Sequence, residues 1–114
     1  MPDFTQKHCI PCEGGVPKLT PAHASEFLGQ VPGWELSADG IKISRTFTFK
    51  NFKVAMVFVN KVADIANEED HHPDILINYS RVTLTLWTHA IGGLSENDFI
   101  IAAKASGLVP DHSR

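Results

Sequence analysis

Two hydrophobic periods divide the middle of the chain into a strand and a helix. Between residues 41 and 50 apolar and polar side chains alternate, which is typical of a strand with one buried face. Arg45 is the charged exception on the apolar face, and we expect it near the edge of the core or facing a partner. From Asn51 the apolar residues recur with the helical period instead, which predicts an amphipathic helix.

The apolar stripe of this helix is wide, and three further apolar residues extend it. We therefore expect the helix to be covered on more than one side. His72-Pro73 should end it, because the residue before a proline avoids the helical conformation. The stripe comprises Phe52, Ala55, Met56, Val59, Val62, Ala63 and Ala66, and Val54, Phe58 and Ile65 widen it.

Capping and turn residues predict the elements on the N-terminal side. Thr20 has the side chain of an N-cap, and Pro21 suits the first helical position, so a helix should run from there to about Gly29. Residues 34–37 predict a short strand. The turn sequence Ala38-Asp39-Gly40 joins it to the strand at 41–50 as a hairpin.

On the C-terminal side, residues 75–79 and 82–89 predict a second hairpin, which Gly92-Gly93 ends. Ser95 should cap a last helix, with Asp98 as the acidic partner of a capping box. The resulting order is α-β-β-α-β-β-α. It predicts an α+β fold, a four-stranded antiparallel sheet with helices packed on one face.

Length and composition indicate one globular domain. Of 114 residues 43% are hydrophobic and 20% are charged, which is ordinary for a folded protein. Residues 1–19, interrupted by prolines and a Gly-Gly pair, should form an irregular N-terminal arm, and residues 20–114 should form the domain.

The same features exclude several classes of function. A net charge of −3 without a basic stretch argues against direct nucleic-acid binding. No apolar run is long enough to span a membrane, and the N-terminus does not resemble a secretory signal. With two cysteines and no signal, a reducing cytoplasm is the expected location.

Asp70-His71-His72-Pro73-Asp74 is the most informative segment for chemistry. Histidine transfers protons in both directions near neutral pH, and a third histidine, His89, stands at the end of a predicted strand. The alternative interpretation is that these are surface or helix-capping histidines.

Metal binding is the rival chemistry, and the spacing argues against it. Adjacent His71 and His72 diverge, and no HExxH motif or second CxxC occurs. The single CxxC, Cys9 to Cys12, is followed by Glu13-Gly14-Gly15 rather than by a helix, so we interpret it as structural or adventitious. We therefore expect no metal site.

Three further groups of residues have two interpretations each. Trp34 and Trp87 could stack on a flat heterocycle or simply belong to the core. Asp98 could be a site carboxylate or only a helix cap. The acidic run at 68–70 could be a solvated helix end, although negative charge is unfavourable at a helix C-terminus and so indicates some use.

Taken together, these motifs resemble the pterin-4a-carbinolamine dehydratase family, also known as the dimerisation cofactor of a hepatocyte homeodomain factor. The resemblance covers roughly residues 20 to 108. One position differs, because Asn67 stands where the family often has glutamate. The matching residues are Gly33-Trp34, Phe47-Thr48-Phe49-Lys50-Asn51-Phe52, His71-His72-Pro73, Tyr79, Thr88-His89, Gly93-Leu94-Ser95 and Asp98.

The resemblance implies dehydration of 4a-hydroxytetrahydrobiopterin to quinonoid dihydropterin, which recycles the pterin cofactor of aromatic amino acid hydroxylases. It implies catalytic roles for His71, His72 and His89, without metal or cofactor. It also implies a homo-oligomer, either a dimer or a tetramer. The alternative is a non-catalytic protein that binds a regulatory partner, such as a transcriptional coactivator, on the same fold. The implied substrate-binding residues are Trp34, Asn67, Pro73 and Asp98.

Overall fold

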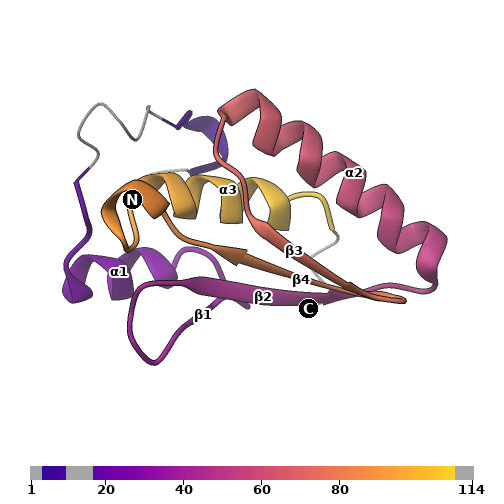
Figure 1. The fold of residues 1–114 in the computed structure, drawn as a ribbon, viewed down its shortest axis with the longest axis horizontal. Coiled ribbons are helices and arrows are strands. Elements are labelled where there is room, and N and C mark those ends of the chain that lie inside the picture. Colours follow the sequence, from indigo (N-terminus) through magenta and orange to yellow (C-terminus); the bar gives the residue numbers. More distant parts are fainter. Residues whose placement is uncertain (1–3, 10–16, 110–114) are drawn as a thin grey trace.

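The four strands form one antiparallel sheet in the order β1-β2-β4-β3, and helices α2 and α3 lie side by side on one face of it (Figure 1). The computed structural model describes residues 4–9 and 17–109. The predicted α-β-β-α-β-β-α order and α+β fold are confirmed. The elements are η1 (Phe4–Gln6), α1 (Pro21–Leu28), β1 (Glu35–Leu36), β2 (Ile43–Thr48), α2 (Phe52–Glu69), β3 (Asp74–Asn78), β4 (Arg81–Leu86), η3 (His89–Ile91) and α3 (Glu96–Ser106).

The central strands β2 and β4 supply the sheet side of the core. They pair in a register that puts Ile43 opposite Leu86 and Phe47 opposite Val82. Because side chains alternate along a strand, one face is apolar and buried, and the other carries threonines. Thr46 and Thr83 are hydrogen bonded across that second face, with their hydroxyl oxygens 2.8 Å apart. The buried set is Ile43, Phe47, Val82, Leu84 and Leu86.

The start of α1 is as expected, with Thr20 accepting a hydrogen bond from the His23 N–H and Pro21 in the first turn. The turn after β1 is also confirmed. Gly40 has a φ of +76°, a conformation that favours glycine. The Ser37 hydroxyl and the Ile41 N–H donate to the Asp39 carboxylate, which lowers the pKa of this exposed group.

Helix α2 begins where the period changes, with the Asn51 side chain accepting from the Val54 N–H at 2.9 Å. Its end differs from the prediction that His72-Pro73 terminates it. Asp70 adopts a left-handed conformation, with φ 54°, and stops the helix at Glu69. The proline therefore follows a helix that has already ended.

Only one stripe of α2 is buried in the single chain. Phe52 and Val54, which belong to the predicted apolar surface, are 46% and 42% exposed, and Val57 is 54% exposed. The helix rests on the sheet and α3 by one face, so the rest of the wide stripe stays open. The buried residues are Ala55, Phe58, Val62, Ala66 and Glu69.

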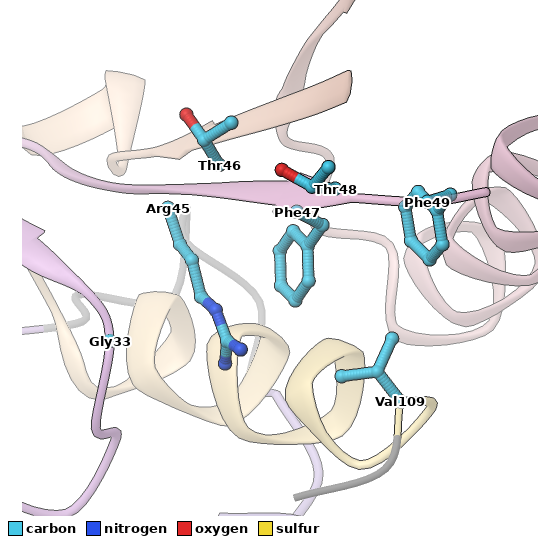
Figure 2. A pocket seen from close by; sticks show the side chains of 7 residues that line it. All are labelled: Gly33, Arg45, Thr46, Phe47, Thr48, Phe49 and Val109. Atoms are coloured by element: carbon cyan, nitrogen blue, oxygen red, sulfur yellow. The ribbon is translucent and has the colours of Figure 1, made fainter. Parts of the chain in front are cut away.

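Arg45 points from β2 into the layer between sheet and helices. Figure 2 shows its side chain directed toward α3 beside Phe47, while Thr46 and Thr48 point to the other side of the strand. The guanidinium lies 4.3 Å from the Phe47 ring centroid and donates to the Ser106 hydroxyl at 3.0 Å. Gly33 makes room for it, because a Cβ there would lie 3.1 Å from the Arg45 Nε.

The first described residues pack against the domain. Phe4 is 3% exposed, and its ring lies 5.1 Å from Phe27 and 6.1 Å from Phe99, centroid to centroid. The division of the chain at residue 19 stays a prediction, but part of the segment before it contributes to the core. Ile10 to Val16, including Cys12, lie outside the described residues. Within the described ranges, no helix is both long and apolar enough to cross a membrane.

Candidate active site

A buried polar network forms at the N-terminus of α3. The Ser95 hydroxyl accepts from the Asn97 N–H at 3.2 Å, and Oδ2 of Asp98 accepts from the Ser95 N–H at 3.0 Å. This is the predicted capping box. The Thr88 hydroxyl adds a second bond to the same Oδ2, at 2.9 Å. Two donors therefore hold the Asp98 side chain in one orientation.

The other oxygen of Asp98 contacts the first histidine of the His71-His72 pair. Oδ1 lies 2.7 Å from Nε2 of His71, and the two residues are 0% and 6% exposed. A carboxylate only accepts hydrogen bonds, so Nε2 is the protonated nitrogen in this contact. In the neutral ring the lone pair is then on Nδ1. Asp98 is therefore both a helix cap and the partner of His71.

His72 points elsewhere and has a different partner. Its Nε2 lies 3.1 Å from Oδ1 of Asn67, one turn back on α2. Both side chains are exposed. Asn67 was expected to bind substrate, and in the structure its side chain bonds to His72.

His89 is the third histidine, and the end of β4 carries it. It opens η3, which closes when the Gly92 N–H donates to the His89 carbonyl, with Gly92 at φ 62°. The His89 ring is exposed and lies against Trp87, with centroids 4.1 Å apart and planes inclined by 32°.

These histidines, from two distant segments, line one cavity of about 310 Å³. That volume is at the lower end of the range for small-molecule pockets. The cavity brings three imidazoles together where proton transfer in both directions is possible. Its lining consists of Asp70, His71, His72, Trp87, His89 and Ala90.

Four of the expected site residues are not among the lining. Asp98 and Asn67 contact the lining histidines His71 and His72, and the other two are Trp34 and Pro73. Trp34 is 4% exposed, packs in the core and donates its indole N–H to the Ser106 hydroxyl at 2.9 Å. Pro73 is half-buried next to His72. The tryptophan at the cavity is Trp87, and one signal in the sequence pointed to it. It stands two residues before His89, so the strand predicted at 82–89 puts both residues on one face.

A second cavity, of about 230 Å³, lies beside Arg45 (Figure 2). Arg45 is its one ionisable lining residue within the described part of the chain, and no histidine, cysteine or carboxylate lines it. It therefore offers no pair of groups for acid–base chemistry. Its lining residues are Gly33, Arg45, Thr46, Phe47, Thr48, Phe49 and Val109.

Side chains able to bind a metal meet at the end of α2, outside the histidine cavity. Ligand atoms of His8, Glu68 and Glu69 lie within 4.8 Å of one another. Glu69 already accepts from Lys104 Nζ at 3.1 Å, from the Cys9 N–H at 2.8 Å and from the His8 ring at 2.8 Å. These contacts use the oxygens that a cation would need.

Fold and site together define an α+β domain with a histidine-lined cavity. A family model described as pterin 4 alpha carbinolamine dehydratase matches residues 17–108, and the chain belongs to this family. A Stenotrophomonas maltophilia protein is 52% identical over 92% of this chain and 90% of its own length. A Nitrosomonas eutropha protein is 50% identical over 94% of both. Both are named, provisionally, pterin-4-alpha-carbinolamine dehydratase.

Solved structures agree on the fold. A Brucella melitensis protein described as a transcriptional coactivator/pterin dehydratase superposes with a TM-score of 0.80 at 34% identity, covering 82% of this chain and all of that one. A pterin dehydratase-like RuBisCO assembly factor of the alpha-carboxysome superposes with a TM-score of 0.58 at 22% identity, covering 67% of this chain and 88% of that one. The second likeness concerns the fold alone.

Proposed function

We propose that this protein dehydrates 4a-hydroxytetrahydrobiopterin, the pterin-4a-carbinolamine, to quinonoid dihydropterin. The observation that carries the proposal is the convergence of His71, His72 and His89 on one cavity, with His71 held by the buried Asp98. The family membership supports the same substrate.

The reaction needs an acid and a base. Hydroxide is a poor leaving group, so a general acid protonates the departing 4a-oxygen, and the lone pair of the adjacent ring nitrogen expels it as water. A base then removes a proton from the ring, which leaves neutral quinonoid dihydropterin. The proton given and the proton taken balance, so the enzyme returns to its starting state once the two groups exchange a proton with water.

We assign the acid–base work to His71 and His89. Asp98 keeps the proton of neutral His71 on Nε2, which leaves Nδ1 as the lone-pair nitrogen and suits the ring for the base. His89, on the other segment and exposed to water, is then the acid. His72, tied to Asn67, positions the pterin. Trp34 and Pro73 do not line the cavity, so we give them no direct contact with substrate.

The proposal extends to the biological setting. The protein would recycle the pterin cofactor of an aromatic amino acid hydroxylase, in the cytoplasm and as a homo-oligomer. The alternative is a partner-binding or coactivator role, because the Brucella relative is described as a transcriptional coactivator as well as a pterin dehydratase. The dehydratase is favoured because a role in partner binding alone would not need three imidazoles around one cavity.

A direct assay tests the proposal, with chemically generated 4a-hydroxypterin as substrate. Replacing His71 or His89 by alanine should lower kcat by about 10²–10⁴, the usual loss for a general acid or base. The low end is expected, because the carbinolamine also dehydrates without enzyme. Replacing His72 should mainly raise KM, since it removes binding common to the ground and transition states.

His23→Ala is the matched control, because His23 is exposed on α1 and should leave the rate unchanged. The double His71→Ala, His89→Ala variant should be little worse than the poorer single variant, since groups acting as a unit are not additive. Full activity in both single variants, with unchanged circular dichroism, would contradict the assignment. A folded wild-type protein without any acceleration would favour the partner-binding role.

A further inference from the structure

The three site histidines are oriented by three different kinds of partner. A buried carboxylate contacts His71, and a side-chain amide contacts His72. For His89 the contact is the indole of Trp87, 4.1 Å away between ring centroids. In residues 4–9 and 17–109, no hydrogen bond to the His89 imidazole is present, so the indole face is its one specific support.

Trp87 is itself fixed from the neighbouring strand. Continuing the register that pairs Ile43 with Leu86 puts Lys42 opposite Trp87, and the Lys42 ammonium lies 5.0 Å from the indole ring centroid. This is a cation–π contact. The indole is therefore contacted by both an ammonium and an imidazole on the open face of the sheet, beside the cavity.

The buried indole N–H of Trp87 indicates that the contribution of this side chain to stability does not by itself explain why a tryptophan stands here. Its nitrogen is buried and has no acceptor within the described part of the chain. Leaving a buried donor without an acceptor is unfavourable, and a phenylalanine would avoid it. A residue that breaks such a rule beside a cavity indicates a functional use.

We propose that Trp87 is a positioning residue that acts through His89, holding the imidazole where it reaches the substrate. The inference rests on the proposed function. His89 is exposed at the start of a short 3-10 helix, so without the indole its side chain would sample several rotamers. Only some of these aim the imidazole into the cavity, and misplacement of a catalytic group lowers kcat more than it raises KM.

Kinetics of two Trp87 variants form the first test. Trp87→Leu removes the aromatic face and should lower kcat roughly tenfold with little change in KM. Trp87→Phe keeps a face against the imidazole and should stay within about threefold of wild type. In a His89→Ala background, Trp87→Leu should cost almost nothing further, because the group through which it acts is already gone.

NMR of the histidine side chains is the second test, and it does not depend on turnover. Ring currents of Trp87 should shift the His89 ring protons, and Trp87→Leu should remove that shift while the His71 and His72 signals stay in place. Trp34, the remaining tryptophan, reports by its fluorescence that the core is intact.

Additive losses in the double variant would overturn the inference, as would His89 signals that do not change in Trp87→Leu. A wild-type protein that shows the shift but does not accelerate dehydration would refute the proposed function while supporting the positioning contact. The two failures are therefore distinguishable.

Discussion

At the scale of single residues, Asp98 has two structural tasks that one substitution can separate. Its Oδ2 closes the capping box of α3, and its Oδ1 contacts Nε2 of His71. From the sequence alone, Asp98 could be a helix cap or a site residue. A cap depends on a residue three positions away, whereas the contact with His71 spans 27 positions. The structure shows that both contacts are made by the same carboxylate.

We expect Asp98→Asn to lower kcat by roughly 10²-fold, because an amide can donate to Nε2 and so shift the proton of neutral His71 to Nδ1. Ser95→Ala is the control. It removes the cap hydroxyl and should cost about 1 kcal/mol of stability while keeping kcat within a few-fold of wild type. Steady-state kinetics and chemical unfolding of both variants test this. Equal losses of kcat would contradict the role given to the carboxylate.

Gly33 supports Arg45 in a way that substitution can measure. It has a φ of +91°, and a Cβ there would lie 3.1 Å from the Arg45 Nε. Gly33→Ala should therefore lower the free energy of unfolding by about 1–2 kcal/mol from backbone strain, plus the cost of moving the guanidinium. Urea unfolding monitored by circular dichroism measures the change.

Gly40→Ala is the matched comparison. Gly40 also has a positive φ, of +76°, but apart from its chain neighbours no described residue has an atom within 4 Å of the added Cβ. It should show the strain alone, so the difference between the two variants isolates the contact with Arg45. If both variants lose the same free energy of unfolding, the Arg45 side chain moves away from the added Cβ without a measurable loss of stability.

At the scale of elements, the end of α2 is the junction of three segments. Glu69, the last residue of the helix, has a side chain that is 3% exposed. Its carboxylate accepts from Lys104 of α3 and from His8 and Cys9 of the N-terminal segment. His71 and His72 follow after Asp70, so this junction fixes the start of the histidine segment.

Burial raises the pKa of Glu69, but the hydrogen bonds from Cys9, His8 and Lys104 lower it by more. The net pKa is about 2, below the ordinary value of 4.5. The folded state therefore binds this proton less readily than the unfolded state. The resulting stabilisation is complete above about pH 4.5 and is lost as the pH falls toward 2.

We expect Glu69→Gln to flatten the loss of stability between about pH 4.5 and pH 2, because the group that titrates is gone. It should also lower stability at pH 7, where the ion pair with Lys104 is lost. Urea unfolding across this pH range measures both effects. Glu68→Gln, at an exposed neighbour, should change the free energy of unfolding at pH 7 little. A steep acid limb that persists in Glu69→Gln would contradict the prediction.

At the scale of the whole molecule, apolar side chains of the described residues remain exposed on a strand and on a helix. Strand β3 is at the edge of the sheet, paired with β4 alone among the described strands, and Leu76 on it is 57% exposed. On α2, Phe52 and Val57 are 46% and 54% exposed. An edge strand with free backbone groups and an uncovered apolar helix face are both surfaces on which a second copy can pack.

We expect the protein to sediment as a dimer or tetramer at micromolar concentration, since burial of these surfaces is favourable. Leu76→Lys should dissociate an assembly built on the sheet edge, and Val57→Lys one built on the helix face. Ala22→Lys, on the exposed side of α1, is the control and should leave the assembly intact. A wild-type species near 12.5 kDa would contradict the expectation.

The sequence by itself determined those features that depend on near neighbours. The two hydrophobic periods predicted β2 and α2, and the Thr20, Gly40 and Ser95 signals predicted a helix start, a turn and a capping box. Each rests on residues a few positions apart, whose contacts are fixed once the local backbone forms. The histidine motif likewise predicted residues that the fold brings to one cavity.

Only the tertiary structure decided which partner each polar side chain found. Trp34 bonds to Ser106, 72 positions away, and belongs to the core, whereas Trp87 lies at the cavity. Arg45 reaches the same Ser106 from β2. Helix α2 ends at the left-handed Asp70, before Pro73 is reached. These outcomes depend on how the layers pack, which pairs residues that are distant in sequence and that no local pattern connects.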